Sequence, residues 1–515
     1  MGSLTQHPAY VALIGHLKEA ATLGTTNAVL GWDEQTYLPP GGAEHRAEQT
    51  ALLAGMYHQR MTDPQLGEWL ATLEEQLPPD ASEHDVAVWV NVRETRRRYD
   101  RATRTPRALV EELSRVATMA QQVWVAARRA SDFSLFLPWL EKMVTLKREQ
   151  AQAQQTDEHA TLYDVLLDEY EPGMRAADVQ RVFEPLREEL TRLLGEITAS
   201  GRRPRREVLQ REYPVARQRE LAIRVAEWIG FDFERGRLDE SPHPFCTSLG
   251  PHDCRLTTRY DPHYFNSAFF GTLHEAGHGL YEQGLPPDAF GTPMGETVSL
   301  GIHESQSRMW ENFVGRSRGF WRYCFPRLQE AFPEVLDDVS EDEFHFAVND
   351  VQPSFIRVEA DEVTYNLHIM LRFELEQEII AGELKPADVP EEWNRRFERD
   401  FGLRPPDDAQ GCLQDVHWSA GLIGYFPTYA LGNMYAAQFY RAADRDLGEL
   451  QGLFGRGDFT PLRRWLNEKI HRHGMRFRAA ELVRVVCGEP LDHRPLIDHL
   501  RRKLAPLYGL QAVTD

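Results

Sequence analysis

Apolar residues recur at intervals of three and four along most of this chain, the spacing that places side chains on one face of an α-helix. One such stripe consists of Leu109, Leu113, Val116, Ala120, Val123 and Ala127. Similar stripes occupy residues 6–31, 141–156, 177–198, 216–229 and 363–382. We interpret these stripes as the core faces of helices. The pattern therefore predicts a mainly α-helical fold.

The stretch from Phe231 to Tyr260 departs from this pattern, because Asp, Pro, Gly and Thr are frequent in it. Residues 243–249 and 254–260 have the composition of two short strands, and the Gly-Pro-His-Asp sequence at residues 250–253 is typical of a turn between them. We therefore expect a small β-sheet just before the next helix.

That next helix, predicted over residues 264–284, contains an H-E-x-x-H element at His274, Glu275 and His278. Helical residues four apart share a face, so the two imidazoles can bind one Zn²⁺ while Glu275 projects toward the open position of the ion. Apolar neighbours at helical spacing predict that the helix is buried, and Gly284 predicts its end. The element indicates a hydrolytic zinc site.

Two glycines, Gly277 and Gly279, lie inside the same predicted helix. Each costs a helix up to about 1 kcal/mol relative to alanine, and a purely structural segment has little reason to accept this cost. We infer that another backbone or a substrate comes close to the helix at this point.

A third metal ligand must come from elsewhere, because Glu282 lies about 12 Å along the helix axis from the first histidine of the motif. A second helix predicted over residues 299–312 can return antiparallel past the first. Glu304 is its expected ligand. Its neighbour His303 points about 100° away, so only one of the two faces the metal. His303 is the second choice, and Glu311 is a distant third.

The composition is that of a folded protein with a large core. The chain has 515 residues, of which 42% are hydrophobic and 27% charged. The 58 basic and 79 acidic residues leave a net charge of −21, which disfavours nucleic acid and anionic membranes as partners. We find no secretory leader, no run of 18 apolar residues, no internal repeat and no linker. One domain over residues 1–515 is expected.

The number and spacing of the cysteines indicate in which cellular compartment the protein works. They are odd in number, scattered and without a C-x-x-C pair: Cys246, Cys254, Cys324, Cys412 and Cys487. This usage indicates neither a disulfide framework nor a thiolate zinc cluster. A cytoplasmic enzyme fits these observations.

Several short motifs occur together with the H-E-x-x-H element. In chain order they are Trp32-Asp33 with Pro39 and Gly42, Asp253-Cys-Arg-Leu-Thr257, His274-Glu-Ala-Gly-His278, His303-Glu-Ser-Gln306, Ile356-Arg-Val-Glu-Ala-Asp361 and Gly411-Cys-Leu-Gln-Asp-Val-His-Trp418. This set resembles the thermostable, or Taq-type, carboxypeptidase family of metallopeptidases. The motifs spread over residues 32 to 430, so the resemblance covers nearly the full length.

The resemblance implies a large helical fold with a central groove, similar to neurolysin and angiotensin-converting enzyme, usually as a homodimer. It implies one divalent ion per chain, Zn²⁺ with Co²⁺ as an alternative. The implied activity is the removal of single C-terminal residues from peptides with broad specificity, sparing Pro at the new end.

The mechanism requires a base and an oxyanion donor in addition to the metal ligands. Glu275 is the expected base, which takes a proton from water and passes it to the leaving amine. Candidates for the donor to the tetrahedral oxyanion are His417, Tyr425 and Tyr429. Folds related to the family place a His and a Tyr in this role beyond the zinc helix. An ordinary buried hydrogen bond is the alternative explanation for each.

An exopeptidase also requires a cation for the terminal carboxylate of its substrate, and the guanidinium fork of arginine suits that group. Arg255 and Arg357 lie in two of the matched motifs. The alternative is that either arginine is only the partner in a structural ion pair.

The sequence leaves two rival interpretations open. An oligoendopeptidase or a dipeptidyl carboxypeptidase would use the same zinc helix and differ in the distance from the metal to the carboxylate-binding arginine. A helical peptide-binding scaffold with structural zinc is the non-enzymatic alternative. Glu275 argues against the scaffold, because a structural site needs no base.

Overall fold

The computed structural model describes residues 4–78 and 81–511, and the remaining residues of the predicted domain 1–515 lie outside the described part. Helices dominate it. The N-terminal part contains α1 (Pro8–Thr36), α2 (Ala43–Met61), α3 (Pro64–Gln76), α4 (Ala81–His84), α5 (Val86–Arg104), α6 (Arg107–Ala130), α7 (Phe133–Gln154), α8 (Leu162–Tyr170), α9 (Ala176–Ala199) and α10 (Val215–Ile229). After the sheet follow α11 (Phe265–Gly284), α12 (Leu300–Arg308), α13 (Arg318–Ala331), α14 (Pro333–Leu336), α15 (Glu341–Val348), α16 (Thr364–Ala381), α17 (Val389–Phe401), α18 (Pro427–Leu447), α19 (Leu450–Gly455), α20 (Thr460–Lys469), α21 (Ala479–Cys487) and α22 (Arg494–Tyr508).

The prediction of a mainly helical fold is confirmed, and each apolar stripe lies on a helix. The stripes correspond to α6, α1, α7, α9, α10 and α16. The ends differ by up to eight residues. Helix α7 begins at Phe133, before the predicted residue 141, because the Asp132 side chain caps its first turn by accepting from the backbone N–H of Ser134. The helix with the H-E-x-x-H element ends at Gly284, as predicted.

The sheet has three strands in the order β1, β3, β2, namely β1 (Gly236–Glu240), β3 (Cys254–Thr258) and β2 (Cys246–Ser248). Strand β3 is parallel to β1 and antiparallel to β2. The two strands expected from the sequence are β2 and β3. Strand β1 was not expected from the sequence, because three of its five residues, Gly-Arg-Leu-Asp-Glu, are charged. Helix α11 packs against β3 and β2, so the sheet lies beside the metal-site helix.

Glycines allow close contacts around helices α11, α12 and α18 in the interior. A Cβ at Gly277 of α11 would lie 2.6 Å from the carbonyl oxygen of Gln306 in α12. A Cβ at Gly279 would lie 2.7 Å from the ring of Phe231, and one at Gly432 of α18 would lie 2.7 Å from Cγ of Glu304. The inferred close approach of another backbone at Gly277 is therefore present, and it is α12 that makes it.

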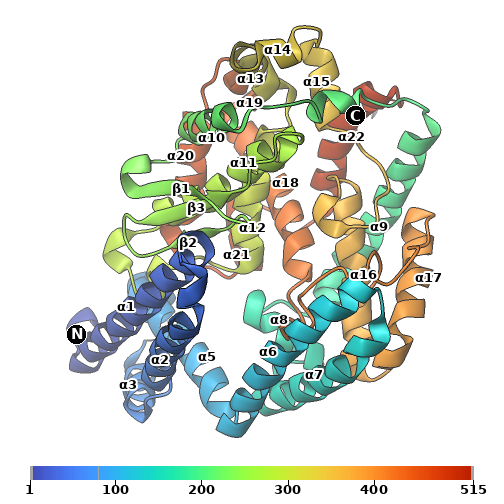
Figure 1. Ribbon diagram of the computed structural model, residues 1–515. Helices are drawn as coiled ribbons and strands as arrows, with labels where there is room; N and C mark the ends of the chain where they lie inside the picture. The colour runs from blue at the N-terminus through green and yellow to red at the C-terminus, as the bar shows by residue number, and fades with distance from the viewer. Residues whose placement is uncertain (1–3, 79–80, 512–515) are drawn as a thin grey trace.

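Figure 1 shows the arrangement of these elements. The N-terminal helices α1–α3 (blue) lie at the lower left and α6–α7 at the lower right, with α5 between them and α12 and α18 above. Helices α1, α3 and α5 enclose a small core of their own, which includes Leu13, Leu66, Leu70, Leu73, Val88 and Val92. In the part of the chain that the structure describes, no helix is both long and apolar enough to cross a bilayer.

Candidate metal centre

Three side chains from two helices converge on one point. His274 and His278 of α11 and Glu304 of α12 offer ligand atoms that all lie within 4.8 Å of one another. Oε2 of Glu304 is 3.7 Å from Nε2 of His274 and 3.5 Å from Nε2 of His278. Donors on a tetrahedral Zn²⁺, with bonds of about 2.0–2.1 Å, stand roughly 3.3–3.5 Å apart, so this donor set fits such an ion. The arrangement is a divalent metal site with the three predicted ligands.

Glu304 is held by neighbours on its own helix. Its Oε1 accepts a hydrogen bond of 2.7 Å from Nε of Arg308, and its Oε2 accepts one of 3.1 Å from the hydroxyl of Ser307. The residue is only 7% exposed. These contacts orient the carboxylate toward the histidines, since Arg308 occupies one oxygen and leaves the other facing them.

Glu311 orients the first histidine. Its Oε2 lies 2.8 Å from Nδ1 of His274, the nitrogen turned away from the metal position. Glu311 lies in a π-helical turn, Met309–Val314, that continues α12. Burial alone would raise the pKa of its carboxyl, but Arg308 and His274 hold that pKa well below its usual range. Glu311 was predicted as the least favoured ligand. It instead contacts the ligand His274 and fixes the tautomer and ring orientation of that histidine.

His303 and Glu282 lie behind the second histidine. Nδ1 of His278 lies 3.1 Å from the carbonyl oxygen of His303, and the two rings are stacked with centroids 4.5 Å apart. Nε2 of His303 is 2.9 Å from Oε1 of Glu282. Neither His303 nor Glu282 belongs to the group of converging ligand atoms among the described residues. The preference for Glu304 over His303 as third ligand agrees with this geometry.

Glu275 follows the first ligand histidine and is 7% exposed. Burial, reinforced by the charge of Glu304, raises the pKa of its carboxyl to about 7, although His274 opposes the shift. A carboxyl with a pKa near neutrality exchanges protons readily at physiological pH, which is the property a general base and acid requires.

The three candidate oxyanion donors form one cluster. Nε2 of His417 lies 3.3 Å from the hydroxyl of Tyr429, and the rings of Tyr425 and Tyr429 are 5.4 Å apart. Gly432, which touches Glu304, lies three residues after Tyr429 on α18, so the cluster borders the metal ligand. Burial lowers the pKa of His417 to about 4 and raises that of Tyr425, so both groups are neutral donors at pH 7.

Arg357 lies against the same cluster. Its guanidinium is 5.1 Å from the ring centroid of Tyr429. Nε and Nη2 donate to Oδ1 of Asp415 at 3.0 and 2.7 Å, and Nη1 donates to the hydroxyl of Tyr365 at 2.9 Å. The residue is 6% exposed. Arg357 is therefore a fixed cation beside the candidate oxyanion donors.

Arg255 lies elsewhere, on β3. It donates to both carboxylate oxygens of Asp253, at 2.9 and 3.0 Å, and its guanidinium is 4.2 Å from the ring centroid of Trp32 in α1. These contacts join the N-terminal helix to the sheet. No contact connects Arg255 with Arg357, His417 or the tyrosines among the described residues, so the structure brings together only one of the two predicted arginines and that cluster.

Sequence reasoning missed Tyr365, which connects the two halves of the site. The guanidinium of Arg308, which holds Glu304, is 4.5 Å from the centroid of the Tyr365 ring, while the hydroxyl of Tyr365 accepts from Arg357. Tyr365 lies four residues after Asp361 in the I-R-x-x-A-D segment, and nothing in its spacing marks it. Only the fold places it between the two arginines.

Replacement of Asp415 by asparagine is expected to lower the free energy of unfolding by about 3–5 kcal/mol, because Arg357 and Arg372 are both buried and both donate to this carboxylate. Chemical denaturation at pH 7 measures the change. The two arginines hold the pKa of Asp415 far below its usual range. The difference in the free energy of unfolding between the wild type and the variant is therefore complete above about pH 5 and shrinks as the pH falls below about 4.

The control is Asp253→Asn. Its carboxylate is 41% exposed and pairs with a single arginine, Arg255, so its loss is expected to cost less than about 1 kcal/mol. Equal effects of the two substitutions would contradict the buried role of Asp415.

Comparison with known proteins extends over all of these residues. The family model described as "Carboxypeptidase Taq (M32) metallopeptidase" matches residues 12–504. The chain is 49% identical to "Thermostable carboxypeptidase 1" of Thermus thermophilus, over 98% of this chain and 100% of that protein. It is 40% identical to "Carboxypeptidase 1" of Bacillus subtilis, over 96% of this chain and 97% of that protein. The crystal structure of an M32 carboxypeptidase from Deinococcus radiodurans R1 matches with a TM-score of 0.93 at 42% identity, covering 98% and 100% of the two chains.

Proposed function

The chain belongs to the Taq-type, or M32, carboxypeptidase family of metallopeptidases. On this basis we propose which of its residues release single C-terminal residues from peptides, and what each of them does. The established part is that the protein is a metallocarboxypeptidase with a His-His-Glu metal site acting on peptides. The roles of individual residues, the metal and the specificity are our proposal.

Zn²⁺ is the proposed ion, with Co²⁺ as the alternative, because two imidazoles and one carboxylate are the donor set of many catalytic zinc sites. A divalent ion held by His274, His278 and Glu304 would supply the Lewis acidity that polarises a peptide carbonyl and activates water. Three protein ligands leave a coordination position free, whereas a structural zinc site takes four. This difference disfavours the scaffold with structural zinc.

Glu275 is proposed to accept the proton of the attacking water and to deliver it to the leaving nitrogen. Its place on α11 directly after His274 and its burial beside the converging ligand atoms support both halves of that task. Tyr425 is the proposed donor to the oxyanion, and Tyr429, which hydrogen-bonds to Tyr425 and lies within hydrogen-bond distance of His417, is its neighbour in the cluster. His417 and Tyr429 are then proposed to position Tyr425 and the substrate.

Arg357 is proposed to bind the terminal carboxylate of the substrate. Its contacts are the observation that supports exopeptidase activity most directly. Of its five N–H donors, three are used by Asp415 and Tyr365, which leaves two for a ligand. Asp415 and Tyr365 hold the fork still, so little entropy is lost when a carboxylate binds. Arg255, the other arginine predicted from the sequence, is the alternative, and the same experiment distinguishes the two.

The test of this proposal compares peptides with free and amidated C-termini. A desolvated pair between arginine and carboxylate contributes about 2–5 kcal/mol to transition-state binding, so kcat/KM is expected to be at least about thirtyfold higher for the free acid. Arg357→Ala should remove most of that preference, and Arg255→Ala should leave it intact.

Mass spectrometry of one N-blocked peptide identifies the products. A ladder that loses one C-terminal residue at a time is expected. Release of dipeptides would favour the dipeptidyl carboxypeptidase alternative. Cleavage at internal bonds, with equal rates on acid and amide, would favour the oligoendopeptidase.

Three further properties are proposed. Broad specificity with Pro spared at the new end and a homodimeric state follow from the family resemblance. A cytoplasmic location is proposed because the five cysteines are free thiols in the structure. Light scattering on the purified protein measures the oligomeric state, and a monomer at micromolar concentration would contradict the dimer.

A further inference from the structure

Helix α11 carries one more acidic side chain beyond its two ligand histidines. His274, His278 and Glu282 follow one another at intervals of four residues, so all three lie on one side of the helix. The Glu282 carboxylate faces α12, where its Oε1 lies 2.9 Å from Nε2 of His303. Glu282 therefore contacts the neighbour of a metal ligand, and not the metal position itself.

The close approach of α11 and α12 brings His303 against His278. Because residue 277 is glycine, the backbone of α12 lies so near that the carbonyl oxygen of His303 is 3.1 Å from Nδ1 of His278. The His303 ring packs on two rings of α11, with centroids 4.5 Å from that of His278 and 5.4 Å from that of Tyr281. These contacts hold the His303 ring in one place.

The hydrogen bonds determine which nitrogen of each ring carries its proton. Nδ1 of His303 lies 2.6 Å from Nδ1 of His278. At that distance one nitrogen must donate and the other accept, because two N–H groups or two lone pairs would repel each other. A metal ligand needs the lone pair of Nε2, so a neutral His278 carries its proton on Nδ1 and donates it. His303 therefore accepts at Nδ1 and carries its own proton on Nε2, where Glu282 accepts it.

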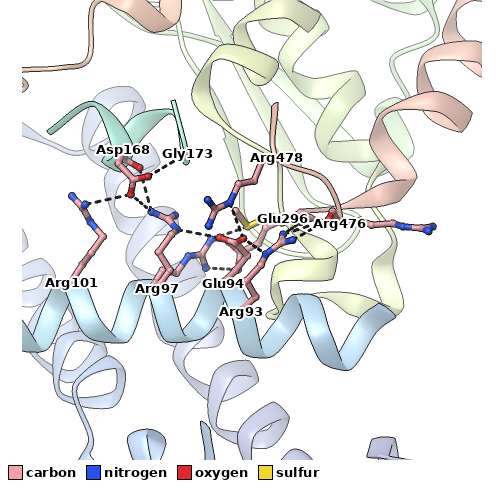
Figure 2. A network of polar contacts seen from close by, with 11 residues as sticks. Arg93, Glu94, Arg97, Arg101, Asp168, Gly173, Glu296, Arg476 and Arg478 are labelled. Carbon is pink, nitrogen blue, oxygen red and sulfur yellow. Dashed lines mark hydrogen bonds and ion pairs between the residues drawn. The ribbon is translucent and has the colours of Figure 1, made fainter. Parts of the chain in front are cut away.

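The contact of Glu282 differs from the structural ion pairs of this protein. Figure 2 shows such pairs at Arg97 of α5, which donates to Glu94 and to Asp168 of α8 at 3.1 Å each. Glu282 has no arginine partner. Within the described part of the chain, its side chain has one hydrogen-bond partner, the imidazole of His303. This carboxylate is therefore placed to select a tautomer rather than to neutralise a cation.

The other ligand histidine has the same kind of support in a shorter form. Glu311 lies 2.8 Å from Nδ1 of His274, with no residue between them. For His278 the carboxylate acts across one imidazole. A hydrogen bond to the outer nitrogen fixes a ligand ring and raises its basicity, and loss of such a partner typically lowers metal affinity about 10–100-fold.

We propose that His303 and Glu282 are positioning residues for His278. Glu282 holds His303 in the tautomer that accepts at Nδ1. His303 in turn fixes the His278 ring, whose Nε2 then lies 3.5 Å from Oε2 of Glu304 at the metal position. The inference rests on the proposed function in one respect, because it takes His278 as a ligand of the ion. The expected consequence is tighter binding of the metal.

The first test measures the dissociation constant for Zn²⁺ by competition with a chromophoric chelator, on the full-length protein. His303→Phe keeps a flat ring but has no acceptor, so the affinity is expected to fall about 10–100-fold. His303→Asn places an amide oxygen at the position of Nδ1, so it should bind Zn²⁺ at least about threefold more tightly than the phenylalanine variant. A role in packing alone predicts the opposite order, because asparagine leaves a void beside Tyr281 and phenylalanine does not.

The second test asks whether Glu282 acts through His303. Glu282→Met removes the carboxylate at similar length and should weaken Zn²⁺ binding about tenfold. In a His303→Asn background the same substitution should change nothing further, because the nitrogen that Glu282 contacts is already gone. Additive effects would show that Glu282 acts by its charge alone and would overturn the proposal. Glu227→Met is the matched control, since Glu227 is an exposed glutamate of α10, and it should leave the dissociation constant unchanged.

A His303→Phe variant that binds Zn²⁺ as tightly as the wild type would also overturn the proposal, since the carbonyl oxygen of residue 303 would then orient His278 alone. If that variant does not fold, equal affinities of Glu282→Met and Glu227→Met would overturn it. Failure of the proposed function has a separate signature. In that case His278→Ala would keep the wild-type affinity for Zn²⁺, and His278 would not be a ligand.

Discussion

A Glu304→Ala variant is expected to lose its divalent ion and its peptidase activity together. Two histidines of α11 would remain, and the carboxylate 3.5–3.7 Å from their Nε2 atoms would be gone. A catalytic zinc site depends on three protein ligands, so bound metal should fall from one ion per chain toward none. Elemental analysis after gel filtration measures the metal, and hydrolysis of an N-blocked peptide with a free C-terminus measures the activity.

Glu311→Gln is the comparator for this experiment. Glu311 contacts His274 and not the ion, so the variant should keep its metal with an affinity lower by about 10–100-fold. If Glu304→Ala keeps its full metal content, the third ligand is instead His303 or Glu311. Thermal unfolding of both variants separates a loss of metal from a loss of fold.

Glu275→Gln is expected to keep the metal and bind peptides normally, but to lower kcat by about 10²–10⁴-fold, the usual contribution of a positioned proton-transfer group. The amide is nearly the same size as the carboxylate and cannot accept the proton of water. Since Glu275 is not among the converging ligand atoms, metal content should not change. A near-native kcat in a metal-loaded variant would show that Glu275 is not the general base.

A second measurement separates chemistry from binding. If Glu275 acts only in proton transfer, KM for the same N-blocked peptide should stay within about threefold of the wild-type value while kcat falls. A parallel rise in KM would point to a role of Glu275 in holding the substrate.

The helices and the core of the metal site were predictable because their determinants are local. The spacing of apolar residues fixes a helix face, and His274, Glu275 and His278 lie within five consecutive residues of one helix. Glu304 required one further step, the choice of a face on a second helix. The strand β1 was not predictable in this way, because its pairing with β3 stabilises a segment whose own composition disfavours a strand.

The contacts around the ligands depend on tertiary structure. Arg255 and Arg357 looked equivalent in sequence, since each lies in a short motif with an acidic neighbour. The fold places one of them against Trp32 and the other against Tyr365 and Asp415. Glu311 carries a partial signal, because residues seven apart lie on one face of a helix, as Glu304 and Glu311 do. Its role as a partner of His274 requires the position of α11.

The glycine contacts between the three central helices bear on how substitutions elsewhere affect the enzyme. At Gly277 and Gly432 the distance between helices is set by backbone and by the ligand side chain itself, with no intervening side chain to change size. Exchanges among apolar residues in the surrounding core can therefore alter stability while leaving the ligand spacing nearly unchanged. Apolar exchanges in that core should therefore be tolerated better than any substitution at these two glycines, where even a methyl group would move a ligand.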